Sequence, residues 1–91
     1  MPHTPHIHES HPAIIARLKK AQGHLAKVIE MMEQSRSCND IAQQLHAVEK
    51  SITNAKKVLI TDHIDHCMDN ILESKDPANT LAGFKEITKY L

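Results

Sequence analysis

The sequence predicts an all-α protein with two long helices and one short C-terminal helix, and three observations lead to this prediction. Apolar residues recur at alternating spacings of four and three in two long stretches, which is typical of helices with one buried face. No proline lies between residues 13 and 76. No stretch shows the strict alternation of apolar and polar residues that indicates a strand.

The first long helix is predicted over about residues 12–34. Pro12 suits the first helical position, with Ser10 or His11 near the cap. Gly23 interrupts the helix at a cost of up to about 1 kcal/mol relative to alanine, and we expect close backbone packing there to be the reason. The apolar seam of this helix consists of Ile14, Leu18, Ala21, Leu25, Val28 and Met32.

The second long helix follows a short connector at residues 35–37 and is predicted to exceed thirty residues, because neither proline nor glycine occurs between 38 and 74. Its apolar seam consists of Ile41, Leu45, Val48, Ile52, Ala55 and Leu59. Asp76 is the predicted N-cap of the third helix and Pro77 its first residue. The third helix carries Leu81, Phe84, Ile87 and Leu91.

Two parts of the chain differ in composition. Residues 1–11 hold two prolines and four histidines with little apolar content, which predicts a flexible histidine-rich arm. Residues 12–91 are predicted to form a single helical domain. A domain this small with long helices needs oligomerisation to bury enough apolar surface, so we expect two chains to form an antiparallel four-helix bundle.

Cys38, His63 and Cys67 form the most informative pattern. His63 and Cys67 are four residues apart and therefore share one helix face, where imidazole and thiolate can chelate one metal ion. Cys38 lies about seven helical turns earlier on the same side, roughly 37 Å away if the helix is continuous. The alternative to metal binding is a structural role, with Cys67 as a small buried residue beside a polar His63. The metal interpretation requires Cys38 of one subunit to reach His63 and Cys67 of another.

The other histidines are less favoured as metal ligands. Those of the arm could supply a further ligand, which would couple metal binding to ordering of the arm. His66 is interpreted as a supporting or surface residue beside the ligand pair. His24 and His46 lie inside the long helices and are predicted to pack or to form hydrogen bonds.

Charge is balanced overall but not along the chain. Residues 12–36 carry five basic and two acidic groups, whereas residues 37–74 carry three basic and six acidic groups. There is no helix-turn-helix signature and no zinc finger, and such charged faces are usually only solvated.

No secretion signal and no apolar run of about 18 residues is present, so we expect a cytoplasmic protein without a membrane partner. The sequence offers no catalytic signature, and we predict that the protein is not an enzyme.

Three segments of the sequence resemble the CsoR/RcnR family of metal- or formaldehyde-responsive bacterial repressors. These are residues 17–25 (RLKKAQGHL), residues 37–48 with Ser37-Cys38 and QQLHAV, and residues 62–67 (DHIDHC). The resemblance implies a tetramer built from two dimers, with metal sites between subunits. It also implies that the metal-free form binds operator DNA through basic residues of the first two helices, and that metal releases it. The residues implied are Arg17, Lys19, Lys20, Lys56 and Lys57.

The resemblance leaves the inducer open among metals. Cys38, His63 and Cys67 match the copper-sensing branch, but Ser37 stands where that branch has tyrosine and Gly83 falls near its glutamate. Ni(II) and Co(II) take more ligands than Cu(I) and accept imidazole and amide nitrogen, which the arm can supply. Ni(II) or Co(II) is therefore slightly favoured over Cu(I). His6 is slightly preferred as the arm ligand, with His3 as the alternative.

Two further functions remain as alternatives. The start of the chain also resembles formaldehyde sensors, in which formaldehyde would cross-link Pro2 and Cys38, although Cys67 departs from that branch. A metal-buffering protein without a DNA role would bind metal tightly and show no salt-sensitive affinity for DNA.

Overall fold

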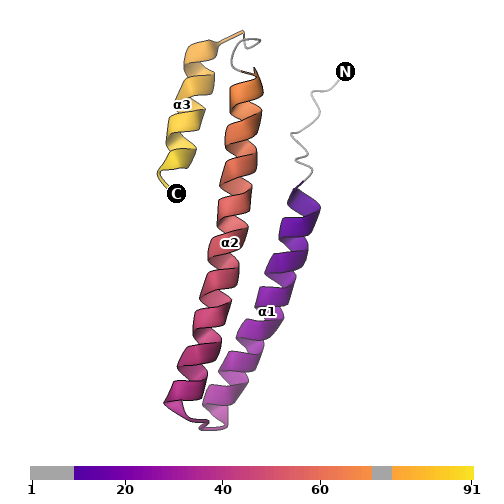
Figure 1. The fold of residues 1–91 in the computed structure, drawn as a ribbon, viewed down its shortest axis with the longest axis vertical. Coiled ribbons are helices and arrows are strands. Elements are labelled where there is room, and N and C mark those ends of the chain that lie inside the picture. Colours follow the sequence, from indigo (N-terminus) through magenta and orange to yellow (C-terminus); the bar gives the residue numbers. More distant parts are fainter. Residues whose placement is uncertain (1–9, 71–74) are drawn as a thin grey trace. The chain divides into compact units, whose positions relative to one another are not determined.

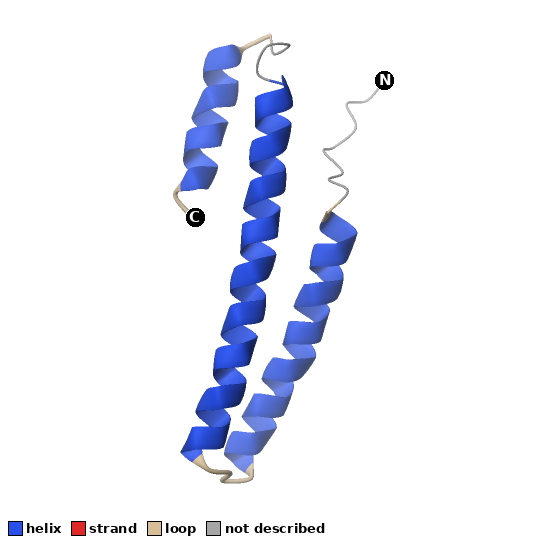
Figure 2. Cartoon of the chain, in the orientation of Figure 1, coloured by secondary structure: helices blue, strands red, loops and turns tan. Residues whose placement is uncertain are grey.

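The computed structural model describes residues 10–70 and 75–91, and these residues form three α-helices and no strand. Helix α1 spans His11–Glu33, α2 spans Cys38–Asn70 and α3 spans Pro77–Thr88 (Figures 1 and 2). The predicted all-α fold is confirmed, and α1 begins one residue before Pro12. Helix α2 has 33 residues, as its lack of proline and glycine predicted. Residues 71–74, where its predicted end falls, lie outside the described residues.

The chain divides into two compact units. One comprises residues 12–55, which are most of α1 and the first part of α2, and the other comprises, among the described residues, 10–11, 56–70 and 75–91. Within the first unit, α1 and α2 run side by side in opposite directions (Figure 1). Helix α2 contributes to both units without interruption. The predicted division into an arm and one helical domain stays a prediction.

The turn between α1 and α2 is closed by backbone and side-chain hydrogen bonds. The amide of Arg36 donates to the carbonyl of Met31 and that of Ser35 to Met32, which satisfies carbonyls at the end of α1. Ser35 has a φ of 56°, the left-handed conformation that this termination requires. The Ser37 hydroxyl accepts from the amide of Asp40 and so caps α2. These contacts place Cys38 at the first residue of α2.

The predicted apolar seam of residues 12–55 divides into an inner and an outer set. The inner seam is at most 6% exposed and packs α1 against α2; it consists of Ile14, Ala21, Val28, Val48 and Ala55. The outer seam is 40–61% exposed and consists of Leu18, Leu25, Met32, Leu45 and Ile52. Near the end of α1 the buried residue is Met31, at 8% exposed, rather than Met32, at 61%. One chain therefore covers about half of its own seam.

The close packing predicted at Gly23 is wrong for the described part of the chain. A Cβ placed at Gly23 would meet nothing within 4 Å. At 100° per residue, position 23 lies about 200° around α1 from the buried Ala21, so it faces away from α2. The cost of glycine is thus not offset by packing against the described residues.

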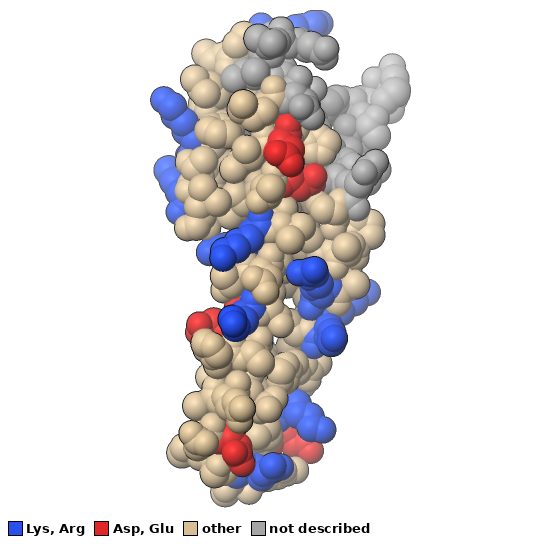
Figure 3. Space-filling view, viewed as in Figure 1, with Lys and Arg blue, Asp and Glu red and all other residues tan. Residues whose placement is uncertain are grey.

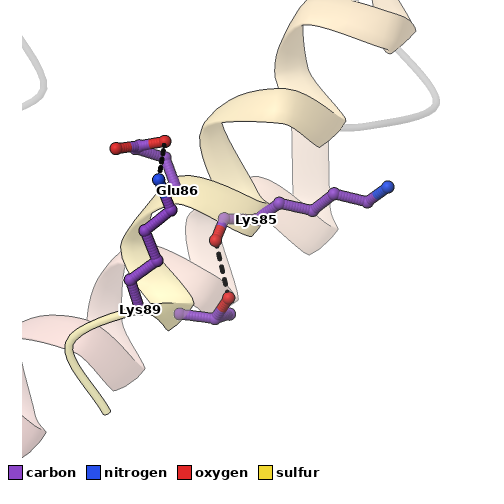
Figure 4. A network of polar contacts seen from close by, with 4 residues as sticks. Lys85, Glu86 and Lys89 are labelled. Atoms are coloured by element: carbon purple, nitrogen blue, oxygen red, sulfur yellow. Dashed lines mark hydrogen bonds and ion pairs between the residues drawn. The ribbon is translucent and has the colours of Figure 1, made fainter.

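The unit of residues 56–91 combines the second part of α2 with α3. Ile60 is 1% exposed, whereas no residue of α3 is fully buried. Near its end, Lys89 pairs with Glu86 at 3.0 Å and the Thr88 hydroxyl donates to the carbonyl of Lys85 (Figure 4). Exposed pairs of this kind contribute little to stability.

Replacing Asp76 with alanine is expected to loosen the start of α3. The Asp76 carboxylate accepts from the amide of Asn79 at 3.1 Å, and Pro77 follows it as predicted. Loss of such an N-cap costs about 1 kcal/mol of helix stability. Hydrogen exchange of the α3 amides should become faster in Asp76→Ala and stay unchanged in the control Lys75→Ala. Equal exchange in the two variants would contradict the capping role.

Candidate metal centre and nucleic-acid interface

The three predicted metal-binding residues all lie on α2. Cys38 is its first residue, and His63 and Cys67 lie within its last eight residues. His63 lies 25 positions after Cys38, which corresponds to roughly 37 Å of helix rise. Cys38 is exposed and not in a disulfide. It therefore lies far along the same helix from the other two candidate ligands.

His63 and Cys67 lie one helical turn apart on α2, as their spacing predicted. His63 is partly buried, and the side chain of Cys67 lies outside the described ones. Among the side chains that the structure describes, no group of three His, Cys, Asp or Glu residues lies close enough to hold a metal ion. His3 and His6, the predicted arm ligands, and Pro2 of the formaldehyde alternative lie outside the described residues.

A carboxylate next to His63 links the base of the arm to the end of α2. The Ser10 hydroxyl donates a hydrogen bond of 2.7 Å to Asp62 Oδ2. The other oxygen, Oδ1, lies 3.6 Å from His66 Nε2. Nothing in the sequence pattern predicted the contact of Ser10, because it joins residues 52 positions apart. Ser10 therefore lies beside the residue that directly precedes His63.

The predicted DNA-binding residues are exposed, and the two units share them. Arg17, Lys19 and Lys20 lie on α1 in one unit, and Lys56 and Lys57 lie on α2 in the other. On the face that Figure 3 shows, basic side chains stand apart from one another and do not form one continuous patch. Within the described ranges, no helix has the length and apolar character needed to cross a membrane.

A polar cavity between α1 and α2 was not predicted from the sequence. It has a volume of about 210 Å³ and is lined by Arg17, Lys20, Ala21, His24, Ser51 and Asn54. His24 Nε2 lies 2.7 Å from Gln44 Oε1, which confirms the expected hydrogen-bonding role of this histidine. Ser51 and Asn54 gave no signal in the sequence, since single polar residues on an exposed helix face are ordinary.

The three helices define an all-α protein. Its longest helix carries a cysteine at the start and a His-x-x-x-Cys pair near the end, and these are separated candidate ligands for a soft metal ion. The chain belongs to the metal-sensitive transcriptional repressor family, whose model matches residues 10–91. The resemblance to the CsoR/RcnR family is thereby confirmed. Members of this family are transcriptional repressors and not enzymes.

Individual relatives sense different metals. The chain is 32% identical over 80 residues to the copper-sensing transcriptional repressor CsoR of Bacillus subtilis, covering 84% of this chain and 79% of the relative. It is 40% identical over 55 residues to CsoR of Mycobacterium ulcerans, covering 60% of this chain and only 47% of that relative. The solved structure of the nickel-responsive transcriptional regulator InrS matches 97% of this chain and 98% of its own, with a TM-score of 0.80 and 25% identity.

Proposed function

We propose that this protein is a cytoplasmic, metal-responsive transcriptional repressor that binds operator DNA when metal-free. Metal binding would favour a conformation with lower DNA affinity and so release genes for efflux or detoxification. This requires only that metal and DNA prefer different states of the oligomer, because the coupling between them is reciprocal. Membership of the metal-sensitive repressor family supports the proposal, as do the candidate ligands on α2.

The observation that carries the proposed metal site is the unbroken course of α2 from Cys38 to Asn70. Since a metal–thiolate bond is only about 2.3 Å long, Cys38 cannot share a metal with His63 and Cys67 of its own straight helix. In an antiparallel pair of chains, Cys38 of one copy would meet His63 and Cys67 of the other. The site would then occur twice in each symmetric dimer.

The outer seam supports this dimer. Leu18, Leu25 and Ile52 are 40–46% exposed in the single chain although they continue the pattern of the buried inner seam. Ile15 and Ile29 add 52% and 51% exposed side chains on α1. Contiguous apolar side chains of this extent mark a protein interface in soluble proteins. A second copy presenting the same stripe would complete a four-helix bundle, and two such dimers would form the tetramer that the family resemblance implies.

The position of Ser10 at the base of the arm supports a further nitrogen ligand from an arm histidine. Such a ligand favours Ni(II) or Co(II) over Cu(I). Ser10, at the base of the arm, is bonded to Asp62, and Asp62 directly precedes His63 on α2. An extended chain reaches about 14 Å over the four residues to His6 and about 24 Å over the seven residues to His3. Ni(II) and Co(II) favour more nitrogen donors than Cu(I), which is content with two thiolates and one imidazole. The arm ligand would thus come from the copy that supplies His63.

On the DNA side, the exposed residues Arg17, Lys19, Lys20, Lys56 and Lys57 are proposed to contact phosphates. Each phosphate that a basic residue neutralises steepens the fall of affinity with salt, by about 0.9 in the log–log slope for duplex DNA. A single chain of zero formal charge gives only a modest field. Repetition of these residues in an oligomer would multiply their contribution.

The function is tested by anaerobic titration of the reduced protein with Ni(II), Co(II) and Cu(I), while anisotropy follows a labelled promoter fragment from beside its own gene. Thiolate-to-Ni(II) or Co(II) absorption that rises as DNA is released would support the proposal. His6→Ala should weaken this response more than His3→Ala. Release by Cu(I) alone would assign the protein to the copper-sensing branch. Release by formaldehyde alone would favour Pro2 and Cys38, and metal binding without any DNA affinity would leave a metal buffer.

A further inference from the structure

Asp62 joins the last part of α2 to the residue that precedes α1. Its Oδ2 accepts a hydrogen bond of 2.7 Å from the Ser10 hydroxyl, and α1 begins at the next residue. Its Oδ1 lies 3.6 Å from His66 Nε2, one helical turn further along α2. Asp62 is followed directly by His63, a candidate metal ligand. One carboxylate therefore connects the start of α1 with the helix segment that carries part of the candidate metal site.

The hydrogen bond between Ser10 and Asp62, here named the Ser10–Asp62 contact, is stronger than an ordinary surface contact. A bond that an ionised carboxylate accepts is shorter and stronger than one between neutral groups. The side chain of Asp62 is only 20% exposed, so solvent and salt screen its charge less than they screen the exposed pair of Lys89 and Glu86. Both residues of the contact belong to the same compact unit. The contact therefore holds the start of α1 against the last part of α2.

The charge of Asp62 also complements the N-terminus of α1. The first backbone amides of a helix have no partner inside the helix and carry a partial positive charge. The first turn of α1, which begins at His11, holds no acidic residue of its own. A carboxylate bonded to Ser10 supplies a negative charge next to this turn. Asp62 thus acts as an acidic partner for α1 that comes from another helix.

Helix α1 leads from Ser10 to residues that are proposed to contact DNA. Arg17 lies seven positions after Ser10, which corresponds to about two helical turns, and Lys20 lies about one turn further. Coupling between distant sites is carried by contacts and rigid elements that both sites can bias. A change in the last part of α2 near His63 would therefore reach the basic residues of α1 through the Ser10–Asp62 contact.

We propose that Asp62 is a positioning residue that transmits metal binding at His63 to α1 through Ser10. The inference rests on the proposed function and identifies a contact through which its two sites are coupled. Without this contact, the metal ligands and the basic residues are all still present. The effect of metal on DNA affinity should nevertheless become smaller, because coupling needs an element that both sites bias.

The test uses full-length variants at both ends of the contact. Ser10→Ala removes the donor, Asp62→Ala removes the acceptor, and Ser10→Thr keeps a hydroxyl at the same position. Asp65→Ala is the matched control for charge, because it removes an exposed carboxylate of α2 that is also close to His63 in sequence. The double variant Ser10→Ala/Asp62→Ala shows whether the two residues act through one contact. Circular dichroism checks that helical content is retained.

Anisotropy with the labelled promoter duplex gives the DNA affinity of each variant without metal and with saturating Co(II). The factor by which Co(II) weakens DNA binding should fall at least about fivefold in Ser10→Ala and in Asp62→Ala, and no further in the double variant. This factor should match the wild type in Ser10→Thr and in Asp65→Ala. DNA affinity without metal and thiolate-to-Co(II) absorption should be retained in every variant. A merely structural role would lower both DNA affinities together and leave the factor unchanged.

Hydrogen exchange in the absence of DNA provides a second measurement. Co(II) should change the exchange of the amides of residues 15–20 in the wild type and in Ser10→Thr. It should leave their exchange unchanged in Ser10→Ala, because the hydroxyl that joins α1 to Asp62 is then missing. This measurement reports on α1 directly and does not depend on DNA binding.

The outcomes separate this proposal from the proposed function. If Co(II) releases DNA from Ser10→Ala and Asp62→Ala as it does from the wild type, the role of Asp62 is wrong and the repressor function stands. If Co(II) does not weaken DNA binding by the wild type but changes α1 exchange only when residue 10 carries a hydroxyl, the Co(II)-responsive repressor function fails and the role of Asp62 stands. If α1 exchange in the wild type does not respond to Co(II), the proposal is overturned.

Discussion

Replacing Cys38 with alanine is expected to abolish metal-induced release of DNA and to leave DNA binding by the metal-free protein intact. Cys38 is exposed at the first residue of α2 and contributes nothing to the core, so its loss should not disturb the fold. It is one of only two thiols in the chain, and its removal would leave a soft metal with an incomplete set of ligands. Thiolate charge-transfer absorption should fall, and the DNA complex should resist metal in the anisotropy titration.

Asn39→Ala is the matched control for this variant, because it alters the neighbouring exposed residue of α2 and leaves both thiols in place. The control should release DNA at the same metal concentration as the wild type. An operator complex of Cys38→Ala that still dissociates at that concentration would contradict the assignment of Cys38 as a ligand.

Mixing two inactive variants tests whether the site is shared between copies. Cys38→Ala retains His63 and Cys67, whereas Cys67→Ala retains Cys38 and His63. In a mixed antiparallel dimer, one of the two sites would receive all three ligands from complementary chains. After unfolding and refolding together, equal amounts should recover about a quarter of the wild-type metal uptake, as expected for random pairing in a two-fold dimer. A site confined to one chain would show no recovery.

Replacing Ile52 with aspartate is expected to dissociate the oligomer. Ile52 is 46% exposed in the single chain, so the charge is tolerated there, but the proposed dimer would bury it without a partner. An uncompensated buried charge costs about 3 kcal/mol or more, which corresponds to a loss of roughly 100-fold or more in dimer affinity. Sedimentation velocity should show a smaller species, and metal uptake should fall with it.

Gln43→Asp is the control for the dimer interface. Position 43 lies nine residues from Ile52, which places it on the opposite side of α2 at 100° per residue. It is exposed, and a carboxylate there should leave the sedimentation coefficient unchanged. Leu25→Asp on α1 provides an independent check, because Leu25 belongs to the same outer seam. If both apolar-to-Asp variants sediment like the wild type, the outer seam does not form the interface.

The helices were predictable from sequence because their signals are local. Pro77 and the Asp76 cap marked the start of α3, and the absence of proline and glycine marked the length of α2. The apolar seam was predictable as a whole, but its division into inner and outer sets was not. Spacings of four and three place all these residues on one broad face, and only the position of the neighbouring helix decides which of them it covers.

The candidate site was predictable only where one helix determines it. The i, i+4 relation of His63 and Cys67 follows from helix geometry and holds in α2. The contact between Ser10 and Asp62 and the polar cavity between α1 and α2 both join residues far apart in the sequence. Their formation depends on the register between elements, which no periodicity within a single helix encodes. Single serine and asparagine residues in the sequence therefore did not predict the cavity.

The unbroken helix α2 has a consequence for how this protein would measure metal in the cell. If one chain carries its metal ligands near the two ends of a single helix, sensing metal requires a second copy of the chain to be present. The apparent metal affinity would then rise with protein concentration, since metal that binds only the paired form also stabilises pairing. A repressor that controls its own abundance would thereby adjust its own detection threshold.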